Sequence, residues 1–233
     1  MPQAAVMRDL FDRVAWRYDL ANKVLSLGSD RRWRGAVARE VVRDNPKLVL
    51  DVCSGTADQI LAIQKRKDFG GRVMGLDISP QMLRRGQEKL RCLGQAGEAV
   101  LSDVHDMPWR EAIFDCVTIC FGVRNFSDMD QGLKEIARVL RPGGKIIILE
   151  FTPPANPLLG SIYRFYLTKI LPRVGGVLTG QGDAYRYLAT SIEGFLTPGQ
   201  LTCRLEASGF VRTQHRFLSA GVVAITTAEK RRT

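Results

Sequence analysis

The feature that most restricts the fold of this chain is an alternation of short apolar runs with helical segments between residues 47 and 151. The apolar runs have the composition of buried strands and lie at residues 48–52, 71–77, 98–102, 114–121 and 145–151. Helices are predicted between them, at 57–66, after Ser79-Pro80 and at 128–140. Strands separated by helices pair in parallel through right-handed crossovers, so we predict an α/β domain.

Helical segments flank this alternation. Apolar residues at helical spacing predict an N-terminal amphipathic helix: Val6, Met7, Leu10, Phe11 and Val14. A second basic helical segment ends before Pro46 and carries Arg31, Arg32, Arg34 and Arg39. Residues 158–171 and 198–208 predict helices, 210–217 and 221–227 a closing β-pair, and 229–233 a loose basic tail. We expect one domain over 1–233, with an N-terminal helical cap at 1–45 and a helical lid or substrate region inserted at 152–197.

The bulk properties of the chain favour a cytosolic globular protein. Its 233 residues suit one domain, and no apolar run reaches the roughly 18 residues that span a bilayer. The N-terminus lacks the charged flank and apolar core of a secretory signal. The five cysteines form no C-x-x-C pair and only two histidines are present, so we expect reduced thiols and no metal site.

The net charge of +10 favours a partner with a negative surface. Nucleic acid and anionic lipid both have such surfaces, and charge alone does not choose between them.

Acidic residues follow the first three predicted strands, where an open α/β sheet binds ligands. The turn Asp51-Val52-Cys53-Ser54-Gly55-Thr56-Ala57-Asp58 comes first, and Gly55 permits a tight bend and close backbone approach by a ligand. Asp77 ends the second strand, where a carboxylate accepts hydrogen bonds from ribose hydroxyls. Asp103 follows the third strand and could accept from an adenine amino group. The pattern predicts a nucleoside site; in the simpler alternative Asp51 and Asp77 only cap strands.

The nucleoside is predicted to be S-adenosylmethionine. The turn has one glycine and does not meet the G-x-G-x-x-G pattern that makes room for a pyrophosphate. S-adenosylmethionine has no phosphate, so a single glycine with polar neighbours suffices. The breaker Arg141-Pro142-Gly143-Gly144 before the fifth strand supports this interpretation.

At this level the sequence resembles the ubiquinone/menaquinone biosynthesis C-methyltransferases, which methylate a ring carbon of a polyprenylated quinol. The resemblance covers nearly the whole chain. Two of its segments, Phe121-Gly122-Val123-Arg124-Asn125 and Tyr185-Arg186-Tyr187-Leu188, are specific to that family. It implies a class I methyltransferase Rossmann-like fold: a mostly parallel seven-stranded sheet, helices on both faces and an antiparallel C-terminal strand pair.

The resemblance also implies cofactor-binding residues. They are Thr56, Asp77, Asp103, Val104 and Cys120, to which the turn itself adds Asp51 and Gly55. Many relatives have Ser where this chain has Cys120, which removes a good hydroxyl donor. Ala57 stands where ubiquinone-type members have Gly, and Cys-x-Gly-Thr-Ala-Asp is similar to the menaquinone branch. The implied reaction converts demethylmenaquinol to menaquinol; the alternatives are a ubiquinone-pathway quinol, another small molecule and nucleic acid.

Carbon methylation needs a quinol oxygen that has lost, or nearly lost, its proton, and a ring carbon in line with the methyl group. Arg124 and Asn125, after the fourth strand, are the residues we expect to orient and stabilise the quinolate. Tyr18 and Asp58 are candidates for closing the site and relaying a proton. The simpler alternatives are a local salt bridge for Arg124, helix packing for Tyr18 and a helix cap for Asp58. A surface role is expected for His105.

Residues 158–171 suit an interfacial helix or a lid over a lipid tail, because aromatic residues alternate there with Arg164 and Lys169, and Arg173 follows. The simpler alternative is a buried cover on the sheet. We expect a polyprenylated naphthoquinol substrate and peripheral association with the anionic inner face of the cytoplasmic membrane. No N-P-P-[YF] sequence follows the fourth strand and no compact RNA-binding module is visible, so a nucleic-acid partner is not expected. A non-catalytic cofactor-binding protein and a homodimer stay open.

Overall fold

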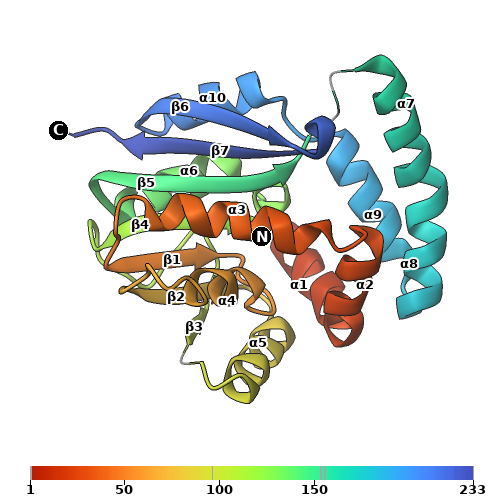
Figure 1. The fold of residues 1–233 in the computed structure, drawn as a ribbon, viewed down its shortest axis with the longest axis horizontal. Coiled ribbons are helices and arrows are strands. Elements are labelled where there is room, and N and C mark those ends of the chain that lie inside the picture. The colour runs from red at the N-terminus through yellow and green to blue at the C-terminus, as the bar shows by residue number, and fades with distance from the viewer. Residues whose placement is uncertain (1, 96, 153, 155, 233) are drawn as a thin grey trace.

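A single sheet lies at the centre of the computed structural model, which describes residues 2–95, 97–152, 154 and 156–232 (Figure 1). Within these residues the sheet has seven strands: β1 Leu48–Val52, β2 Arg72–Asp77, β3 Glu98–Leu101, β4 Phe114–Cys120, β5 Leu140–Phe151, β6 Phe210–Leu218 and β7 Val223–Lys230. Their order is β3-β2-β1-β4-β5-β7-β6, with parallel pairing from β3 to β5. Strand β7 is antiparallel to both of its neighbours, which confirms the expected C-terminal pair.

Helices cover both faces of the sheet because the strand side chains alternate between two apolar layers. Val49 of β1 packs with α3 Ser29–Val42 and α4 Asp58–Gln64, whereas Leu50 and Val52 pack on the other face. That second face is covered by α6 Met129–Val139 and α10 Pro198–Ala207. The fifth sheet-flanking helix is α5 Pro80–Cys92, capped by the Ser79 hydroxyl as expected.

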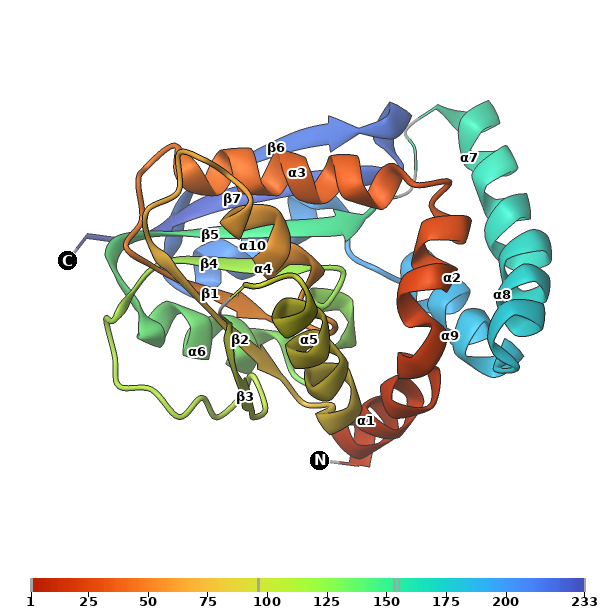
Figure 2. The ribbon, with the colours of Figure 1, turned by 60° about the horizontal axis from the view of Figure 1, so that its bottom comes forward.

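The predicted cap and insertion pack against each other beyond the carboxyl ends of the parallel strands (Figures 1 and 2). Of the predicted cap, residues 1–45, this part contains α1 Pro2–Val14, a 3₁₀ turn Ala15–Arg17 and α2 Tyr18–Leu25, to which the word cap refers from here on, whereas α3 packs on the sheet. The insertion consists of α7 Pro157–Phe165, a π-helical segment Tyr166–Ile170, α8 Leu171–Thr179 and α9 Gly182–Glu193. Tyr166 Oη joins the two parts by donating to the Leu25 carbonyl at 2.6 Å. Residues 1, 153 and 155 of these segments lie outside the described part of the chain.

Two boundaries differ from the sequence expectation. The prediction of a loose basic tail at residues 229–233 is wrong for its first two residues. Glu229 and Lys230 belong to β7 and pair with Val211 and Phe210 of β6. Strand β7 lies between two neighbours, so hydrogen bonds from both sides extend it; Glu229 also forms a 2.8 Å ion pair with Arg212. Strand β5 likewise starts earlier than residue 145, at Leu140 opposite Phe114, and an irregularity in the register separates this pair from the pair of Lys145 with Cys116.

Candidate active site

Two cavities lie between the sheet and the helical part of the molecule. The first, here called the sheet cavity, is formed by the carboxyl ends of β1, β2 and β4, the loop after β3 and helix α1. The second, called the helical cavity, has a volume of about 300 Å³ and lies between α1, α2, α3 and the insertion. The sheet cavity therefore occupies the crevice that the sequence predicted for a nucleoside.

The turn after β1 is held in an unusual backbone conformation. Cys53, Gly55 and Ala57 have φ of +56°, +52° and +66°, the left-handed region that costs residues with a side chain about 1–3 kcal/mol. Gly55 donates its backbone N–H to Asp77 Oδ2 at 2.8 Å. The turn is thereby fixed against the end of β2, with Gly55 exposed to the sheet cavity.

Asp77 lies at the floor of the sheet cavity. Its Oδ1 accepts from the Ser79 backbone N–H at 2.9 Å, so each carboxylate oxygen already accepts one backbone hydrogen bond and can accept another. Burial raises its pKa to about 6, against the opposing effect of the hydrogen bonds from Ser79 and Gly55. A ligand that donates hydroxyl groups would stabilise the ionised form.

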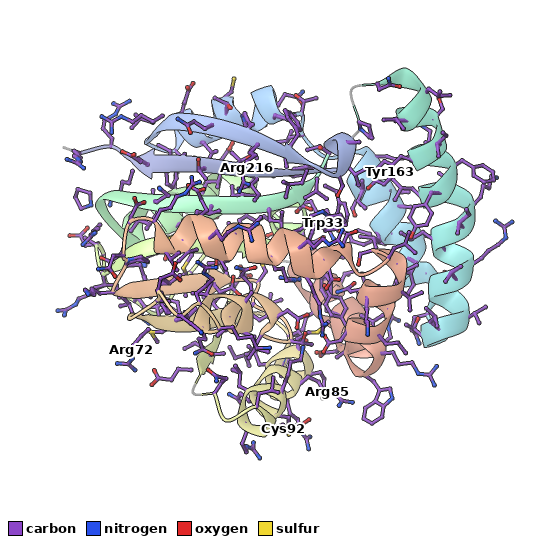
Figure 3. The ribbon with its side chains drawn as sticks, in the orientation of Figure 1. Trp33, Arg72, Arg85, Cys92, Tyr163 and Arg216 are labelled. Atoms are coloured by element: carbon purple, nitrogen blue, oxygen red, sulfur yellow. The ribbon has the colours of Figure 1, made fainter. Side chains whose placement is uncertain are left out.

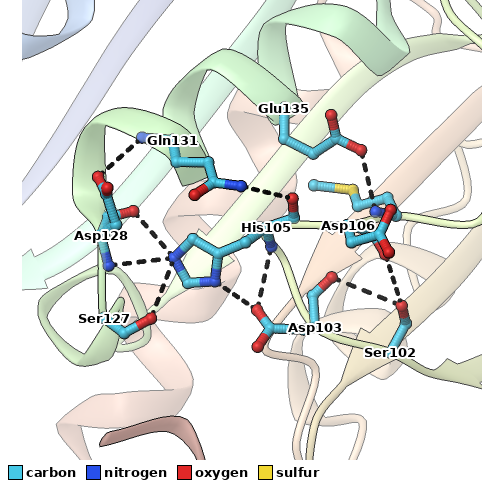
Figure 4. Close-up of polar contacts among 9 residues, drawn as sticks. Ser102, Asp103, His105, Asp106, Ser127, Asp128, Gln131 and Glu135 are labelled. Carbon is cyan, nitrogen blue, oxygen red and sulfur yellow. Dashed lines mark hydrogen bonds and ion pairs between the residues drawn. The ribbon is translucent and has the colours of Figure 1, made fainter. Parts of the chain in front are cut away.

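Asp103 is positioned by His105, as Figure 4 shows. The Asp103 carboxylate accepts the His105 backbone N–H at 3.0 Å and contacts ring Nδ1. Ring Nε2 lies 2.9 Å from the Asp128 carbonyl oxygen and 3.2 Å from the Asp128 backbone nitrogen, which ties this loop to the start of α6. His105 is partly exposed, with 13% of its side chain accessible, and it joins two loops of the cavity wall.

The remaining predicted cofactor residues divide into two groups. Val104 and Cys120 line the sheet cavity, and the Cys120 thiol donates to Gln59 Oε1 at 3.4 Å. Asp51 is only 1% exposed, does not line either cavity and accepts from the Thr118 hydroxyl at 2.6 Å. Burial raises its pKa to about 7. Asp51 therefore lies inside the protein at the start of the turn, where it stabilises the turn without contacting either cavity.

Thr56 and Asp58 belong to a cluster centred on Lys89 of α5, here called the Lys89 clasp. Lys89 Nζ lies 3.1 Å from Thr56 Oγ1, 2.9 Å from Asp58 Oδ1 and 2.5 Å from Asp19 Oδ2. Thr56 also donates to Asp19 Oδ1 at 2.6 Å. Neither Thr56 nor Asp58 lines either of these two cavities, and Asp58 is the first residue of α4, whose N-cap is Ala57. The clasp fastens the N-terminal cap to the cofactor turn.

A second polar contact holds α1 over the sheet cavity. The Ser79 hydroxyl donates to Asp12 Oδ1 at 2.5 Å, at the N-terminus of α5. Met7 and Phe11 of α1 line the cavity directly. The N-terminal helix thus forms one wall of the site, a position that its amphipathic pattern alone did not indicate.

The two cavities share a wall. Its residues line both: Phe11, Tyr18, Phe121 and Asn125. Asn125 Oδ1 accepts from the Tyr187 hydroxyl of α9 at 3.2 Å, and burial raises the pKa of Tyr18. The structure therefore brings the predicted residues Tyr18 and Asn125 together at the one place where ligands of the two cavities would meet.

Arg124 lines the helical cavity. It also forms a local salt bridge, which was the simpler of the two roles expected for it from the sequence. Its Nη1 donates to Glu150 Oε1 at 2.6 Å and to the Phe121 carbonyl at 2.7 Å. Burial raises the pKa of Glu150, while the Arg124 charge opposes that shift. Arg124 Nε, Glu150 Oε2 and the Tyr163 hydroxyl are buried without a hydrogen-bond partner among the described residues. Such orphaned groups beside a cavity are typical of a polar ligand site.

Three aromatic rings form one side of the helical cavity. Phe121 and Phe151 stack at 4.6 Å between centroids, and Trp33 contacts them at 6.0 and 6.2 Å. Trp33 comes from α3, and Tyr163 of α7 also lines the cavity; both are labelled in Figure 3. Arg34 lies over the Phe121 ring at 5.6 Å. The cavity offers flat apolar surfaces with a few polar groups, which suits an aromatic ring with oxygen substituents.

The donor set of the sheet cavity fits a cationic nucleoside. Among the described residues that line it are the carboxylates Asp77 and Asp103 but neither lysine nor arginine, which a phosphate group would favour. Apolar side chains such as Leu76, Met82 and Phe126 provide surfaces for a purine. S-adenosylmethionine has two ribose hydroxyls, an adenine and a sulfonium charge, and matches these features.

Several residues of the site were not predicted. Lys89, Glu150 and Tyr163 are ordinary members of amphipathic or strand patterns, and Arg34 was noted only as part of a basic helix. The signal that could have pointed to Glu150 is its charge within an otherwise apolar strand, since buried carboxylates are usually paired.

The sequence is similar to methyltransferases of quinone biosynthesis over almost its full length. The model of the ubiE/COQ5 methyltransferase family matches residues 2–230. A demethylmenaquinone methyltransferase of Deinococcus radiodurans is 40% identical over 225 residues, covering 97% of this chain and 92% of that protein. One of Thermotoga maritima is 42% identical over 202 residues, covering 86% of each chain. A ubiquinone/menaquinone biosynthesis C-methyltransferase of Geotalea daltonii is 38% identical, covering 96% of each.

Solved structures of methyltransferases have the same fold. A phosphoethanolamine N-methyltransferase of Haemonchus contortus, in complex with S-adenosylhomocysteine, aligns with a TM-score of 0.68 at 15% identity and covers 97% of this chain and 60% of that one. A SAM-dependent methyltransferase of Thermotoga maritima aligns with a TM-score of 0.64 at 16% identity, covering 97% and 100%. The class I methyltransferase Rossmann-like fold is thereby confirmed.

Proposed function

This chain belongs to the ubiE/COQ5 methyltransferase family, and on that premise we propose that it converts demethylmenaquinol to menaquinol with S-adenosylmethionine as methyl donor. It is an S-adenosylmethionine-dependent methyltransferase. The relatives named demethylmenaquinone methyltransferase and the composition of the helical cavity support the quinol as the acceptor.

The sheet cavity holds the cofactor in this proposal. Asp77 accepts the ribose hydroxyls, Asp103 the adenine amino group, and Gly55 allows the backbone to approach the ligand. Val104 and Cys120 border the base and the donor end of the cavity. Bound there, S-adenosylmethionine supplies a methyl group on a positively charged sulfur. Asp51 and Thr56 contribute indirectly, the first beneath the turn and the second through the Lys89 clasp.

The helical cavity holds the quinol ring in this proposal. Tyr18 and Asn125 stand at the shared wall and align the ring carbon with the methyl group. Arg124, oriented by Glu150, stabilises the negative charge that forms on a ring oxygen as its proton leaves. Asp58 acts through the clasp by closing the cap rather than by touching the substrate.

The observation that carries this function is the shared wall of Phe11, Tyr18, Phe121 and Asn125 between a nucleoside cavity and an apolar ring cavity. Purified protein with methyl-labelled S-adenosylmethionine and demethylmenaquinol should give labelled menaquinol by mass spectrometry. A parallel incubation with the benzoquinol of the ubiquinone pathway measures specificity. Confirmed cofactor binding without label on either ring would exclude the proposed function.

We also propose that the outer face of α7 and the segment after it bind an anionic membrane surface. Leu158, Ile162 and Phe165 are 71%, 59% and 59% exposed, and Arg164 and Lys169 lie among them. The opposite face of the same segment lines the helical cavity through Tyr163 and Tyr166, among others. A prenyl tail could therefore stay in lipid while its ring enters the protein.

No helix among the described residues is long and apolar enough to cross a membrane. Sedimentation would distinguish a monomer from the homodimer that the sequence left open.

A further inference from the structure

Arg34 is a cation of the helical cavity with no direct counter-charge. It lies on α3 and lines the cavity with Trp33 and Phe121. Its Nε is buried without a hydrogen-bond partner, and its guanidinium forms no ion pair within the described part of the chain. The guanidinium lies over the face of the Phe121 ring, 5.6 Å from the centroid. Arg124, the other arginine of this cavity, has its charge balanced by Glu150.

An unpaired cation in a partly desolvated cavity costs stability, so its presence needs a reason. The nearby carboxylates are engaged elsewhere: Asp58 with Lys89, Asp51 with Thr118, and Asp30 with Ser26. Burial by itself would lower the pKa of Arg34, but Cys120, Asp58, Tyr18 and Asp51 raise it, so the guanidinium stays charged. The charge is therefore available to an anionic group that enters the cavity.

Arg34 lies near the end of the helical cavity that borders the sheet cavity, where the methyl transfer is proposed to occur. The charges of both Arg34 and Arg124 lower the pKa of Tyr18, so both guanidiniums lie within electrostatic range of its hydroxyl. Tyr18 belongs to the wall shared with the cofactor. An oxygen on a ring seated against Phe121 would thus lie near Arg34.

We propose that Arg34 donates hydrogen bonds to an oxygen of the bound quinol and holds it as the quinolate. The inference rests on the proposed function, because it assumes a hydroxylated ring in the helical cavity. It places Arg34 beside Arg124 as a second group that stabilises the oxyanion, and the charge of Arg34, unlike that of Arg124, is not paired with a carboxylate among the described residues.

The test is the ionisation of a bound hydroxyarene. A suitable probe is 2-geranyl-1-naphthol, which has one ring hydroxyl and a short prenyl tail, and which cannot become a quinone by simple loss of hydrogen. The absorbance of its anion is followed at saturating protein between about pH 6 and 11. With Arg34 present, the bound naphthol should ionise about one to two pH units lower than in Arg34→Gln. Arg34→Lys should keep part of this shift because it keeps the charge.

A matched control comes from the same helix. Arg31 is exposed and does not line the cavity, so Arg31→Gln should ionise the naphthol as the parent does. Arg34→Gln should melt at about the same temperature as the parent, because the Arg34 Nε has no hydrogen-bond partner in the described part of the chain and little is lost with it. A structural role would instead lower the melting temperature and leave the ionisation unchanged.

Methyl transfer is measured in parallel. Arg34→Gln should lower kcat/KM for demethylmenaquinol by roughly 100-fold while S-adenosylmethionine affinity changes by less than about twofold. Equal naphthol ionisation in parent and Arg34→Gln overturns the assignment even if the parent methylates quinol. A lost shift in a protein that transfers no methyl group supports Arg34 and rejects the proposed function. Failure of the parent to bind the naphthol overturns the assignment as well.

Discussion

Arg124 and Glu150 form a buried ion pair at the end of β5, with 2.6 Å between Nη1 and Oε1 and side chains only 7% and 3% exposed. The pair connects the η2 turn Val123–Asn125, which carries Asn125, to the strand that carries Phe151. Because each charge compensates the other in a desolvated place, the two residues should act as a unit in stability and in turnover.

Glu150→Met should lower the free energy of unfolding by about 3–5 kcal/mol, since it leaves the Arg124 charge buried without its partner. The double variant Arg124→Met/Glu150→Met should lose much less, because both charges are gone. Urea denaturation of the parent, both single variants and the double variant gives the coupling energy. Additive losses would show that the two side chains do not compensate each other.

Arg124→Ala should reduce turnover by about 100-fold and change the affinity for S-adenosylmethionine by less than about twofold. The reason is its place in the helical cavity, away from the residues that line the cofactor side. Steady-state kinetics and calorimetric titration of the cofactor measure the two effects. A parallel loss of both would make Arg124 a cofactor ligand or a structural residue.

The affinity for S-adenosylmethionine should fall as the pH drops through about 6, the pKa of Asp77 in the folded protein. Ribose hydroxyls favour the carboxylate, so binding below that pH must release a proton. In the ligand-free protein the raised pKa of Asp77 means that its protonated form is the more stable one. Asp77 therefore contributes to folding stability below about pH 4, and this contribution is lost as the pH rises through about 6.

The control for this pH effect is Asp77→Asn, which should weaken binding by about 10–100-fold and remove this dependence between about pH 5 and 7. Asp68→Asn, at an exposed position distant from the cavities, should behave as the parent does. An unchanged pH profile in Asp77→Asn would assign the titration to another group. Calorimetry at several pH values, in two buffers of different protonation enthalpy, measures the released proton directly.

Lys89→Met should loosen the N-terminal cap, because Asp19 and Asp58 then face each other without the shared cation. Amide exchange over residues 12–25 should become about 10–100-fold faster, and the cofactor should dissociate faster. Arg91→Met, exposed on the same helix, is the matched control. Unchanged exchange in Lys89→Met would show that α1 packing, not the clasp, holds the cap.

Ile162→Ser/Phe165→Ser should reduce binding to vesicles that contain phosphatidylglycerol by at least about tenfold, since two exposed apolar side chains leave the interface. Binding by the parent should weaken as salt rises, because the basic residues of the segment contribute through screened charge. Leu93→Ser removes a side chain of similar exposure at the end of α5 and should bind as the parent does. Equal binding by all three proteins would place the membrane contact elsewhere.

Much of the fold could be predicted from local pattern. Strand β1, the helix start at Ser79-Pro80 and the closing β-pair are each decided by composition and capping within a few neighbouring residues. The end of β7 could not be predicted, because Glu229 and Lys230 are charged and are held in the strand by neighbours distant in sequence.

The candidate site was predicted only in part for the same reason. Asp77, Asp103 and Gly55 lie at or just after the carboxyl ends of parallel strands. These ends lie along the same edge of a parallel sheet, so the sequence order of strands is enough to predict that the three residues come together. Thr56 and Asp58 also follow β1, yet their side chains turn toward Lys89, which is 31 residues from Asp58. Which side of a turn a polar side chain takes depends on the helix that packs there.

The sequence by itself determined the α/β alternation, the strand-end carboxylates and the family motifs, because these depend on residue type and spacing along the chain. Only the tertiary structure decided that Arg124 is paired with Glu150 while Arg34 is left without a counter-charge. Charge compensation is a property of distances between segments, and α3, η2 and β5 are far apart in the sequence and meet only in the folded sheet and the helix that packs on it.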